Sequence, residues 1–366
     1  MINKNLPIDK MFLFAVIQLI AYGALMMYSA SSYIGEQKFG NHLHYLIMHA
    51  KWIAIGIVAY QLVSKLKYRQ LKTIIPIIVI STWIIMILAF FLNTGKEPSR
   101  WLIINGKSWM TTSDMARIML IIYTAYFIEK HADNLKNLKF MITRFTPIPL
   151  ITLLIIIRQP DLSSTVIIGL IILCMLLIAK VSYKYIGLII LLGSLLVLYK
   201  ISTTDYMYNR ITTWSSNEII DNQQKKSIMA LGSGGAFGKG LGNSELKNGR
   251  LPAAHTDFIF SVIGEEYGFF LGTGYIFLIF MLIFHLGIQT IKIAPDRFSL
   301  FLSLGVIINI IFYFLINVAY VIGYAPNTGL SLPFISYGGS NTIFTLIGIG
   351  LLVNISRDSQ KFKNAQ

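Results

Sequence analysis

Long apolar runs separated by short polar segments recur from one end of the chain to the other. Most of these runs reach the length of about 17 to 25 residues with which a helix crosses a membrane. The pattern therefore predicts an all-α polytopic membrane protein with about ten transmembrane helices. We expect them at residues 11–31, 46–64, 73–93, 112–129, 145–158, 163–180, 184–200, 267–291, 299–322 and 340–356.

The composition excludes a soluble globular protein. Of the 366 residues, 55% are hydrophobic and 13% are charged, and the mean hydropathy is +0.65. The single cysteine, Cys174, lies inside an apolar run, which excludes a disulfide framework and a metal site built from thiolates. We expect one transmembrane domain, residues 1–366, with one large hydrophilic loop at 201–266.

The distribution of charge predicts the orientation in the membrane. If the N-terminus is cytoplasmic, 17 of the 31 Lys and Arg and 5 of the 16 Asp and Glu lie inside, a net charge of +12. The outer segments then carry only +3. This asymmetry is the positive-inside pattern, so we expect cytoplasmic termini and an extracytoplasmic 201–266 loop. The net charge of +15 is thus a topology signal and does not indicate a nucleic-acid partner.

Several cations lie on the outer side, where that rule would deplete them: Arg100, Lys107, Arg117, Arg158 and Arg210. Arg117 falls inside the predicted fourth span, where an unpaired cation is costly. One interpretation is an ion pair with Asp114, one helical turn earlier. The other is a cavity that binds an anion such as a diphosphate, which needs several fixed positive charges. Both interpretations stay open.

The stretch from Leu251 to Glu266 is where the outer loop concentrates its reactive side chains. Asp257 precedes a short apolar run, and there it would serve equally well as a helix N-cap. Beside Phe258 and Phe260 at a membrane rim, its carboxylate would also be partly desolvated and suited to accept a proton. A cap and a base are compatible roles.

Two other features are weaker. The glycine-rich run at 232–242 does not fit a P-loop or a dinucleotide fingerprint, so we expect an irregular loop with positive φ and close backbone approach. His42, His44 and His49 cluster near an outer interface, but no acidic or cysteine partner has metal-site spacing.

At this point the motifs resemble a known family. The runs His255-Thr-Asp-Phe-Ile-Phe260 and Gly264-Glu-Glu-Tyr-Gly268 resemble the signature of the SEDS (shape, elongation, division, sporulation) proteins. Further matches follow in the family's order along nearly the whole chain. They are Tyr28-Ser-Ala-Ser31, Ser99-Arg-Trp101, Gln159-Pro-Asp-Leu162, Gly232-Ser-Gly-Gly235, Gly240-Leu-Gly-Asn-Ser244 and Gly329-Leu-Ser-Leu-Pro-Phe-Ile-Ser-Tyr-Gly-Gly-Ser340. The resemblance is greatest to the division-type FtsW branch.

The resemblance implies a peptidoglycan glycosyltransferase that polymerises lipid II at the outer face of the bacterial cytoplasmic membrane, at the division septum. It places Asp257 as the catalytic residue, a general base for the acceptor hydroxyl. The expected substrate-binding residues are Arg100, Asp114, Arg117, Asp161, Arg210, His255, Thr256, Glu265, Ser336 and Tyr337. No cofactor is certain. A divalent cation, Mg²⁺ or Mn²⁺, is a candidate for the diphosphate, and its ligands are unassigned.

The partners that the resemblance implies are lipid II as substrate, a class B penicillin-binding transpeptidase and other division proteins. Departures from the family pattern occur at Thr111 to Asp114, at Arg117 and at Ala253. A lipid II flippase and a non-catalytic division scaffold remain alternatives.

Overall fold

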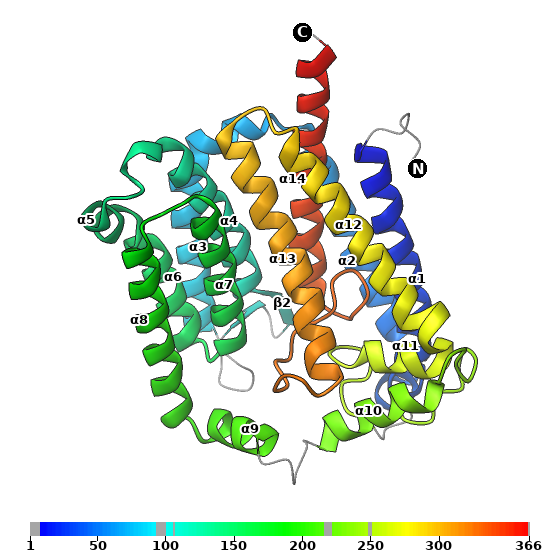
Figure 1. The fold of residues 1–366 in the computed structure, drawn as a ribbon. Helices are drawn as coiled ribbons and strands as arrows, with labels where there is room; N and C mark the ends of the chain where they lie inside the picture. Colours follow the sequence, from blue (N-terminus) through cyan, green and yellow to red (C-terminus); the bar gives the residue numbers. More distant parts are fainter. Residues whose placement is uncertain (1–7, 93–99, 105–106, 216–221, 248–250, 365–366) are drawn as a thin grey trace. The chain divides into compact units, whose positions relative to one another are not determined.

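The structure is a computed structural model, and it describes residues 8–92, 100–104, 107–215, 222–247 and 251–364. Helices dominate this part of the chain, as the element order in Figure 1 shows. The helices that coincide with the predicted spans are α1 (Ile8–Phe39), α2 (His44–Lys65), α3 (Leu71–Leu92), α4 (Thr112–Lys130), α6 (Pro147–Arg158), α7 (Leu162–Ile178), α8 (Tyr183–Ser202), α12 (Gly274–Lys292), α13 (Arg297–Val321) and α14 (Gly339–Asn364).

All ten predicted spans coincide with helical segments. Seven of these segments are long and apolar enough to cross a membrane, or eight if a pair bent by 53°, Leu138–Phe145 with Pro147–Arg158, forms one span. Of the remaining two predictions, α7 is shorter, and α4 carries Asp114, Arg117, Glu129 and Lys130. A polytopic helical membrane fold is therefore confirmed, whereas the count of ten spans stays a prediction.

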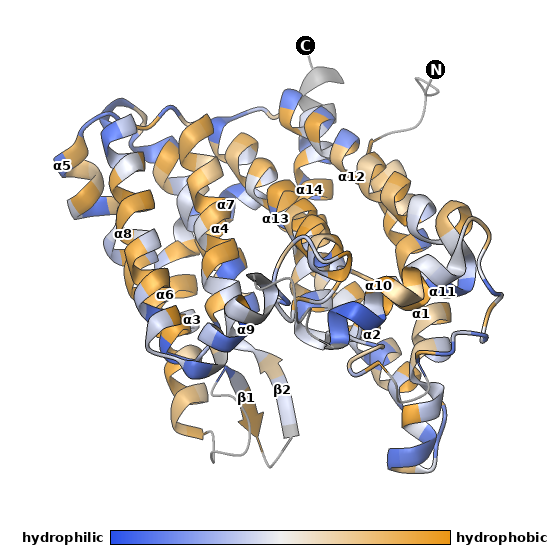
Figure 2. Ribbon diagram, turned by 60° about the horizontal axis from the view of Figure 1, so that its bottom comes forward, coloured by the Kyte–Doolittle hydropathy of each residue, from blue (hydrophilic) through white to orange (hydrophobic). Residues whose placement is uncertain are grey.

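The outer faces of the helices are apolar. Figure 2 shows predominantly hydrophobic colouring along the long helices and more hydrophilic colouring in the connecting segments. Large apolar side chains are widely exposed on them, including Leu62 at 64%, Ile77 at 67% and Phe91 at 77%. A soluble protein does not expose contiguous apolar surface of this kind, so these faces are suited to lipid.

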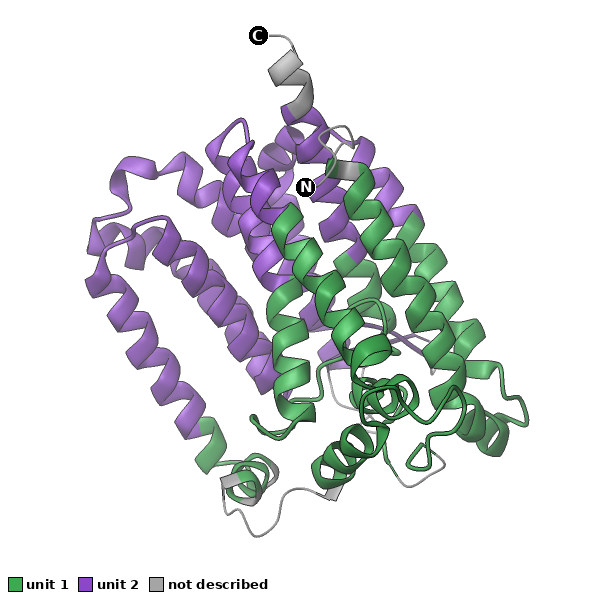
Figure 3. Ribbon diagram, turned by 45° about the vertical axis from the view of Figure 1, so that its right-hand side comes forward, with its two compact units in different colours: residues 1–57, 200–286, 310–345 green, residues 58–199, 287–309, 346–366 purple. Residues whose placement is uncertain are grey.

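The chain divides into two compact units (Figure 3). Unit 1 comprises residues 1–57, 200–286 and 310–345, and unit 2 comprises residues 58–199, 287–309 and 346–366. In unit 1, Gly23 of α1 packs so closely on the backbone of Phe334 and Ile335 that a Cβ atom would lie 2.8 Å from it. In unit 2, Gly305 of α13 meets Ile121 and Met175 equally closely. Both contacts show that glycines permit close helix packing, which is typical of membrane helices.

Short elements within the hydrophilic segments were not predicted from the sequence. In unit 2, β1 (Trp101–Ile104) pairs antiparallel with β2 (Lys107–Thr111) immediately before α4. In unit 1, the large loop contains α9 (Asp205–Ser215), α10 (Asn222–Gly234) and α11 (Ile259–Gly268). A five-residue π-helix, Phe269–Thr273, joins α11 to α12. The helix at the eighth predicted span thus begins several residues before the expected residue 267.

Candidate active site

Asp257 is the last residue before the N-cap of α11, at the end of a compact turn in unit 1. The backbone N–H groups of Thr256 and Phe258 donate to the carbonyl of Ala253, at 3.1 and 3.2 Å. Ala253 itself has a φ of 57°, an uncommon conformation for a residue with a side chain. The turn therefore fixes the backbone of Asp257 just before the start of α11.

The interpretation of Asp257 as a helix N-cap is wrong. The N-cap position of α11 is Phe258, and no side chain donates or accepts a capping hydrogen bond there. The cap is displaced because Thr256 and Phe258 both bond to Ala253, which delays the first helical residue to Ile259.

The backbone of Asp257 is held by α13 within the same unit. Its carbonyl oxygen accepts hydrogen bonds from the Tyr320 hydroxyl at 2.7 Å and from Asn317 Nδ2 at 3.0 Å. Both of these side chains are buried, and both also donate to the Leu330 carbonyl, at 2.9 and 2.8 Å. Two rigid donors thus fix the residue's position while its own side chain stays partly exposed.

The charge environment of Asp257 includes a cation. Arg210 of α9 and Asp257 both lie within electrostatic range of the Tyr320 hydroxyl. The Asp257 Oδ2 atom lies 3.7 Å from the position that a Cβ on Gly329 would occupy, so the 329–340 segment approaches this carboxylate closely. The structure therefore places Asp257 against the segment that carries Ser336 and Tyr337, with Arg210 acting on the same tyrosine as Asp257.

His255 belongs to an aromatic cluster beside this turn. Its ring lies 4.5 Å from that of Tyr45 and 6.0 Å from that of Tyr337, measured between centroids. The Tyr337 amide donates to the His255 carbonyl at 3.0 Å, and Trp52 hydrogen-bonds the Tyr337 side chain. Burial lowers the pKa of His255 to about 4, so the imidazole is neutral at pH 7. Ser336 is buried, and its Oγ accepts from the Leu332 amide at 2.8 Å.

Glu265 lies in the last turn of α11 and is enclosed by the glycine-rich loop. Its carboxylate accepts hydrogen bonds from Ser244 Oγ at 2.6 Å and from Lys239 Nζ at 2.9 Å. The Glu245 amide donates to it as well, at 3.2 Å. Glu265 is 1% exposed, so this carboxylate is engaged inside the protein. The prediction that it contacts substrate stays a prediction.

Glu266 is held in the same way by a second lysine. Lys247 Nζ lies 2.7 Å from Glu266 Oε1 and 2.8 Å from Ser29 Oγ of α1. The Ser29 hydroxyl donates to the same carboxylate at 2.7 Å. Because the side chains of Lys247 and Glu266 are 6% and 0% exposed, this is a fully desolvated ion pair. We call the two lysine–glutamate pairs, with Ser29 and Ser244, the glutamate clamp.

Sequence reasoning did not find the basic half of the glutamate clamp. Like Arg100 and Arg210, Lys239 and Lys247 lie on the predicted outer side, where the positive-inside rule depletes lysines. This unusual placement was the only sign in the sequence that the two lysines have a specific role. The pairing itself joins residues 19 and 26 positions apart in the chain. No local periodicity indicates it.

Residues 235–242 of the glycine-rich run adopt the expected irregular loop, whereas residues 232–234 form the last turn of α10. Gly235, Gly238, Gly240 and Gly242 all have positive φ, between 55° and 93°. A Cβ on Gly238 would lie 2.2 Å from the Glu266 carbonyl oxygen. The amides of Lys239 and Gly240 donate to the carbonyls of Glu265 and Glu266, both at 2.9 Å. The loop therefore lies directly against the end of α11.

The remaining predicted residues belong to unit 2, where two ion pairs lie near the start of α4. Arg117 is fully buried, and its Nη2 lies 3.3 Å from Asp114 Oδ1, as the ion-pair interpretation expected. Asp161 caps α7 by accepting from the Ser164 amide at 3.2 Å, and it also accepts from Ser113 Oγ at 2.8 Å. Arg100 Nη1 lies 3.5 Å from Asp161 Oδ1.

This unit 2 cluster is supported by neutral polar contacts. The Thr112 hydroxyl donates to Gln159 Oε1 at 2.8 Å, and Gln159 Nε2 donates to the Met86 carbonyl at 2.9 Å. The segment that joins α6 to α7 is thereby fastened to α3 and α4. Within the described residues, no group of three or more His, Cys, Asp or Glu side chains is placed to hold a metal ion.

Comparison with known proteins identifies relatives over nearly the whole length. The family described as cell cycle proteins, FtsW/RodA/SpoVE, matches residues 9–361. The probable peptidoglycan glycosyltransferase FtsW of Geobacter metallireducens is 33% identical over 358 residues, covering 95% of this chain and 94% of that protein. Stage V sporulation protein E of Bacillus subtilis is 31% identical over 373 residues, covering 98% and 100%.

Solved structures share the fold. The rod shape determining protein RodA of Thermus thermophilus aligns with a TM-score of 0.65 and 20% identity, covering 95% of this chain and 96% of that one. A chain from a structure of a peptidoglycan synthase complex that coordinates polymerization and crosslinking aligns with a TM-score of 0.74 and 19% identity, covering 95% and 97%.

Proposed function

The chain belongs to the FtsW/RodA/SpoVE family and is a peptidoglycan glycosyltransferase, and we propose that it polymerises lipid II with Asp257 as its general base. The observation that carries this assignment is the set of contacts that holds Asp257 in place. Two buried donors from α13 fix its backbone carbonyl, and the residue is partly exposed. A base held in this way is preorganised for proton transfer.

The proposed reaction is a glycosyl transfer between two lipid-linked sugars. The 4-hydroxyl oxygen of the acceptor forms a bond to the anomeric carbon of the donor, and its proton passes to the Asp257 carboxylate. The bond from the anomeric carbon to the lipid diphosphate breaks, and the diphosphate leaves with its electron pair. Arg210, the predicted diphosphate contact that belongs to unit 1, would stabilise the developing negative charge.

The other predicted diphosphate contacts, Arg100 and Arg117, already hold Asp161 and Asp114 within unit 2. A divalent cation remains part of the proposal as a second means of neutralising the leaving group.

The protein is a multi-pass membrane protein, and we place its termini in the cytoplasm and residues 201–266 outside the cytoplasmic membrane. The charge asymmetry of the sequence supports this topology. Asn243 is an exposed residue of the glycine-rich loop. A cysteine there, in a Cys174→Ser background, should react with an impermeant maleimide added to intact spheroplasts. Labelling only after membrane disruption would refute the topology.

We also propose that the chain works with a class B penicillin-binding transpeptidase at the division septum, since polymerised strands must then be crosslinked. The likeness of the fold to a chain of a peptidoglycan synthase complex supports such a pairing. Co-purification of the tagged chain with a transpeptidase from its own cells is the expected result. Failure to recover one, with septal wall synthesis unaffected, would remove this partner.

The test of the catalytic assignment is Asp257→Asn. Asparagine is nearly isosteric but cannot accept the proton, so formation of glycan ladders from lipid II should fall by at least about 100-fold. Wild-type and variant protein should elute identically in size-exclusion chromatography. The matched control is Glu245→Gln, an exposed carboxylate of the same loop, which should leave the ladders unchanged. An active Asp257→Asn protein would exclude Asp257 as the base.

A further inference from the structure

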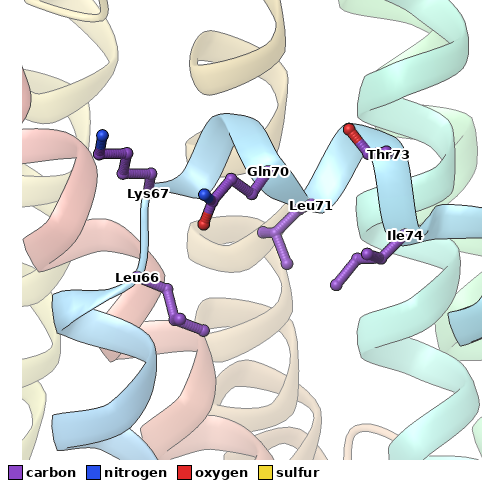
Figure 4. A pocket seen from close by; sticks show the side chains of 6 residues that line it. All are labelled: Leu66, Lys67, Gln70, Leu71, Thr73 and Ile74. Carbon is purple, nitrogen blue, oxygen red and sulfur yellow. The ribbon is translucent and has the colours of Figure 1, made fainter.

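A pocket at the predicted cytoplasmic end of unit 2 has no place in the reaction proposed above. It has a volume of about 440 Å³ and is lined by Leu66, Lys67, Gln70, Leu71, Thr73 and Ile74, where α2 gives way to α3. This volume lies within the range of roughly 300 to 1,000 Å³ typical of small-molecule sites. Figure 4 shows its labelled side chains.

The pocket is amphipathic. In Figure 4 the Leu66, Leu71 and Ile74 side chains extend to one side of the backbone, whereas the Lys67 ammonium and the Thr73 hydroxyl extend to the other. A second cavity of about 180 Å³ shares Leu66 and Leu71 and is lined by apolar side chains and Tyr68. Leu66 and Leu71 thus lie between the pocket and a second, largely apolar cavity.

The surrounding cations are not all neutralised. Of the four basic residues in the 65–72 segment, Arg69 pairs with Asp296 at 3.4 Å and Lys72 with Glu129 at 2.6 Å. Lys65 and Lys67 are exposed, and neither has an ion-pair partner among the described residues. One cation without an ion pair, Lys67, therefore lines the pocket, and a second, Lys65, directly precedes the lining residue Leu66.

We propose that this pocket binds one anionic phospholipid, with its phosphate at Lys67 and Lys65 and an acyl chain along Leu66, Leu71 and Ile74. A basic pocket between membrane helices on the cytoplasmic side is suited to such headgroups. A soluble anion would not use the apolar floor. A neutral phospholipid would leave both lysines without a counter-charge.

The proposal can be tested on the full-length protein in detergent. Native mass spectrometry should show retention of phosphatidylglycerol in preference to phosphatidylcholine of the same acyl length. Each lysine near an anionic lipid contributes about a fivefold gain in affinity. Lys67→Gln should therefore weaken phosphatidylglycerol binding about fivefold, and Lys65→Gln/Lys67→Gln roughly 25-fold. Lys136→Gln, which changes another exposed cytoplasmic lysine, is the matched control and should have no effect.

Three results would overturn the proposal. One is equal retention of the two phospholipids by the wild-type protein. Another is an equal loss of binding in Lys136→Gln, which would show general charge attraction only. The third is displacement of phosphatidylglycerol by glycerol 1-phosphate, which would show that the pocket binds a free anion. None of the variants changes a residue of the proposed active site, so failure here would not affect the assignment of Asp257.

Discussion

Removing the cation of the buried Lys247–Glu266 pair should strongly destabilise the protein. In Lys247→Met, the Glu266 carboxylate keeps only neutral donors, the Ser29 hydroxyl and, at 3.4 Å, the Ser244 amide. Breaking a fully buried ion pair by deleting one partner typically costs about 3 to 5 kcal/mol. Exposed pairs contribute about 0 to 1 kcal/mol. Because the two side chains here are 6% and 0% exposed, the larger range applies.

Thermal unfolding in detergent and a double-mutant cycle would measure this effect. Lys247→Met should lower the free energy of unfolding by about 3 to 5 kcal/mol, and Lys247→Met/Glu266→Gln should regain at least about 2 kcal/mol of it. Lys239→Met is the matched control. Lys239 is more exposed, and Glu265 retains Ser244 and the Glu245 amide, so a smaller loss is expected. Purely additive effects, or a larger loss in Lys239→Met, would refute the reasoning.

Three further predictions concern single positions. Gly238→Ala should lower the free energy of unfolding by at least about 2 kcal/mol more than Gly242→Ala. Both glycines have positive φ, but only at Gly238 would a Cβ lie 2.2 Å from a backbone oxygen. Equal melting temperatures of the two variants would contradict this. Burial lowers the His255 pKa from 6.5 to about 4. The contribution of its neutral ring to the free energy of unfolding is therefore complete above pH 6.5 and is lost as the pH falls toward 4. This loss is up to about 3 kcal/mol, and His255→Phe should flatten the pH dependence of the melting temperature over that window. Arg100→Ala should raise the KM for lipid II and lower stability more than Arg158→Ala does, because Arg100 pairs with the buried Asp161 whereas Arg158 is exposed. Identical KM values in the two variants would exclude a role of Arg100 in substrate binding.

Much of the fold followed from the sequence because apolar length and charge asymmetry are local properties. The ten predicted segments are all helical, and residues 235–242 of the glycine-rich run form the expected loop with positive φ. The short apolar run after Asp257 was considered as a helix, and it forms α11, whereas the eighth predicted span began only at residue 267. In the structure, the burial of Glu265 and Glu266 depends on Lys239 and Lys247, which come from another part of the chain.

The sequence predicted which residues of the candidate site carry reactive side chains, but not which residues contact them in the fold. Asp257 was recognised from its motif and its apolar neighbours, and the Asp114–Arg117 pair from helical spacing. Asn317 and Tyr320, which hold the Asp257 backbone, lie 60 and 63 residues away in a helix that has the pattern of an ordinary span. Tyr45, whose ring contacts that of His255, is still more remote in sequence. Such contacts depend on tertiary packing, which no local pattern encodes.

The order of the glutamate clamp along the chain has a consequence for biogenesis. A buried carboxylate without a cation or hydrogen-bond donor is costly, because burial disfavours the charged form. Ser29, Lys239, Ser244 and Lys247 all precede Glu265 and Glu266, so every side-chain donor of the clamp has been synthesised before the acids emerge from the ribosome. The two acids can therefore fold into the outer loop with their counter-charges already available. The order of synthesis matches the order in which burial of the acids needs its partners.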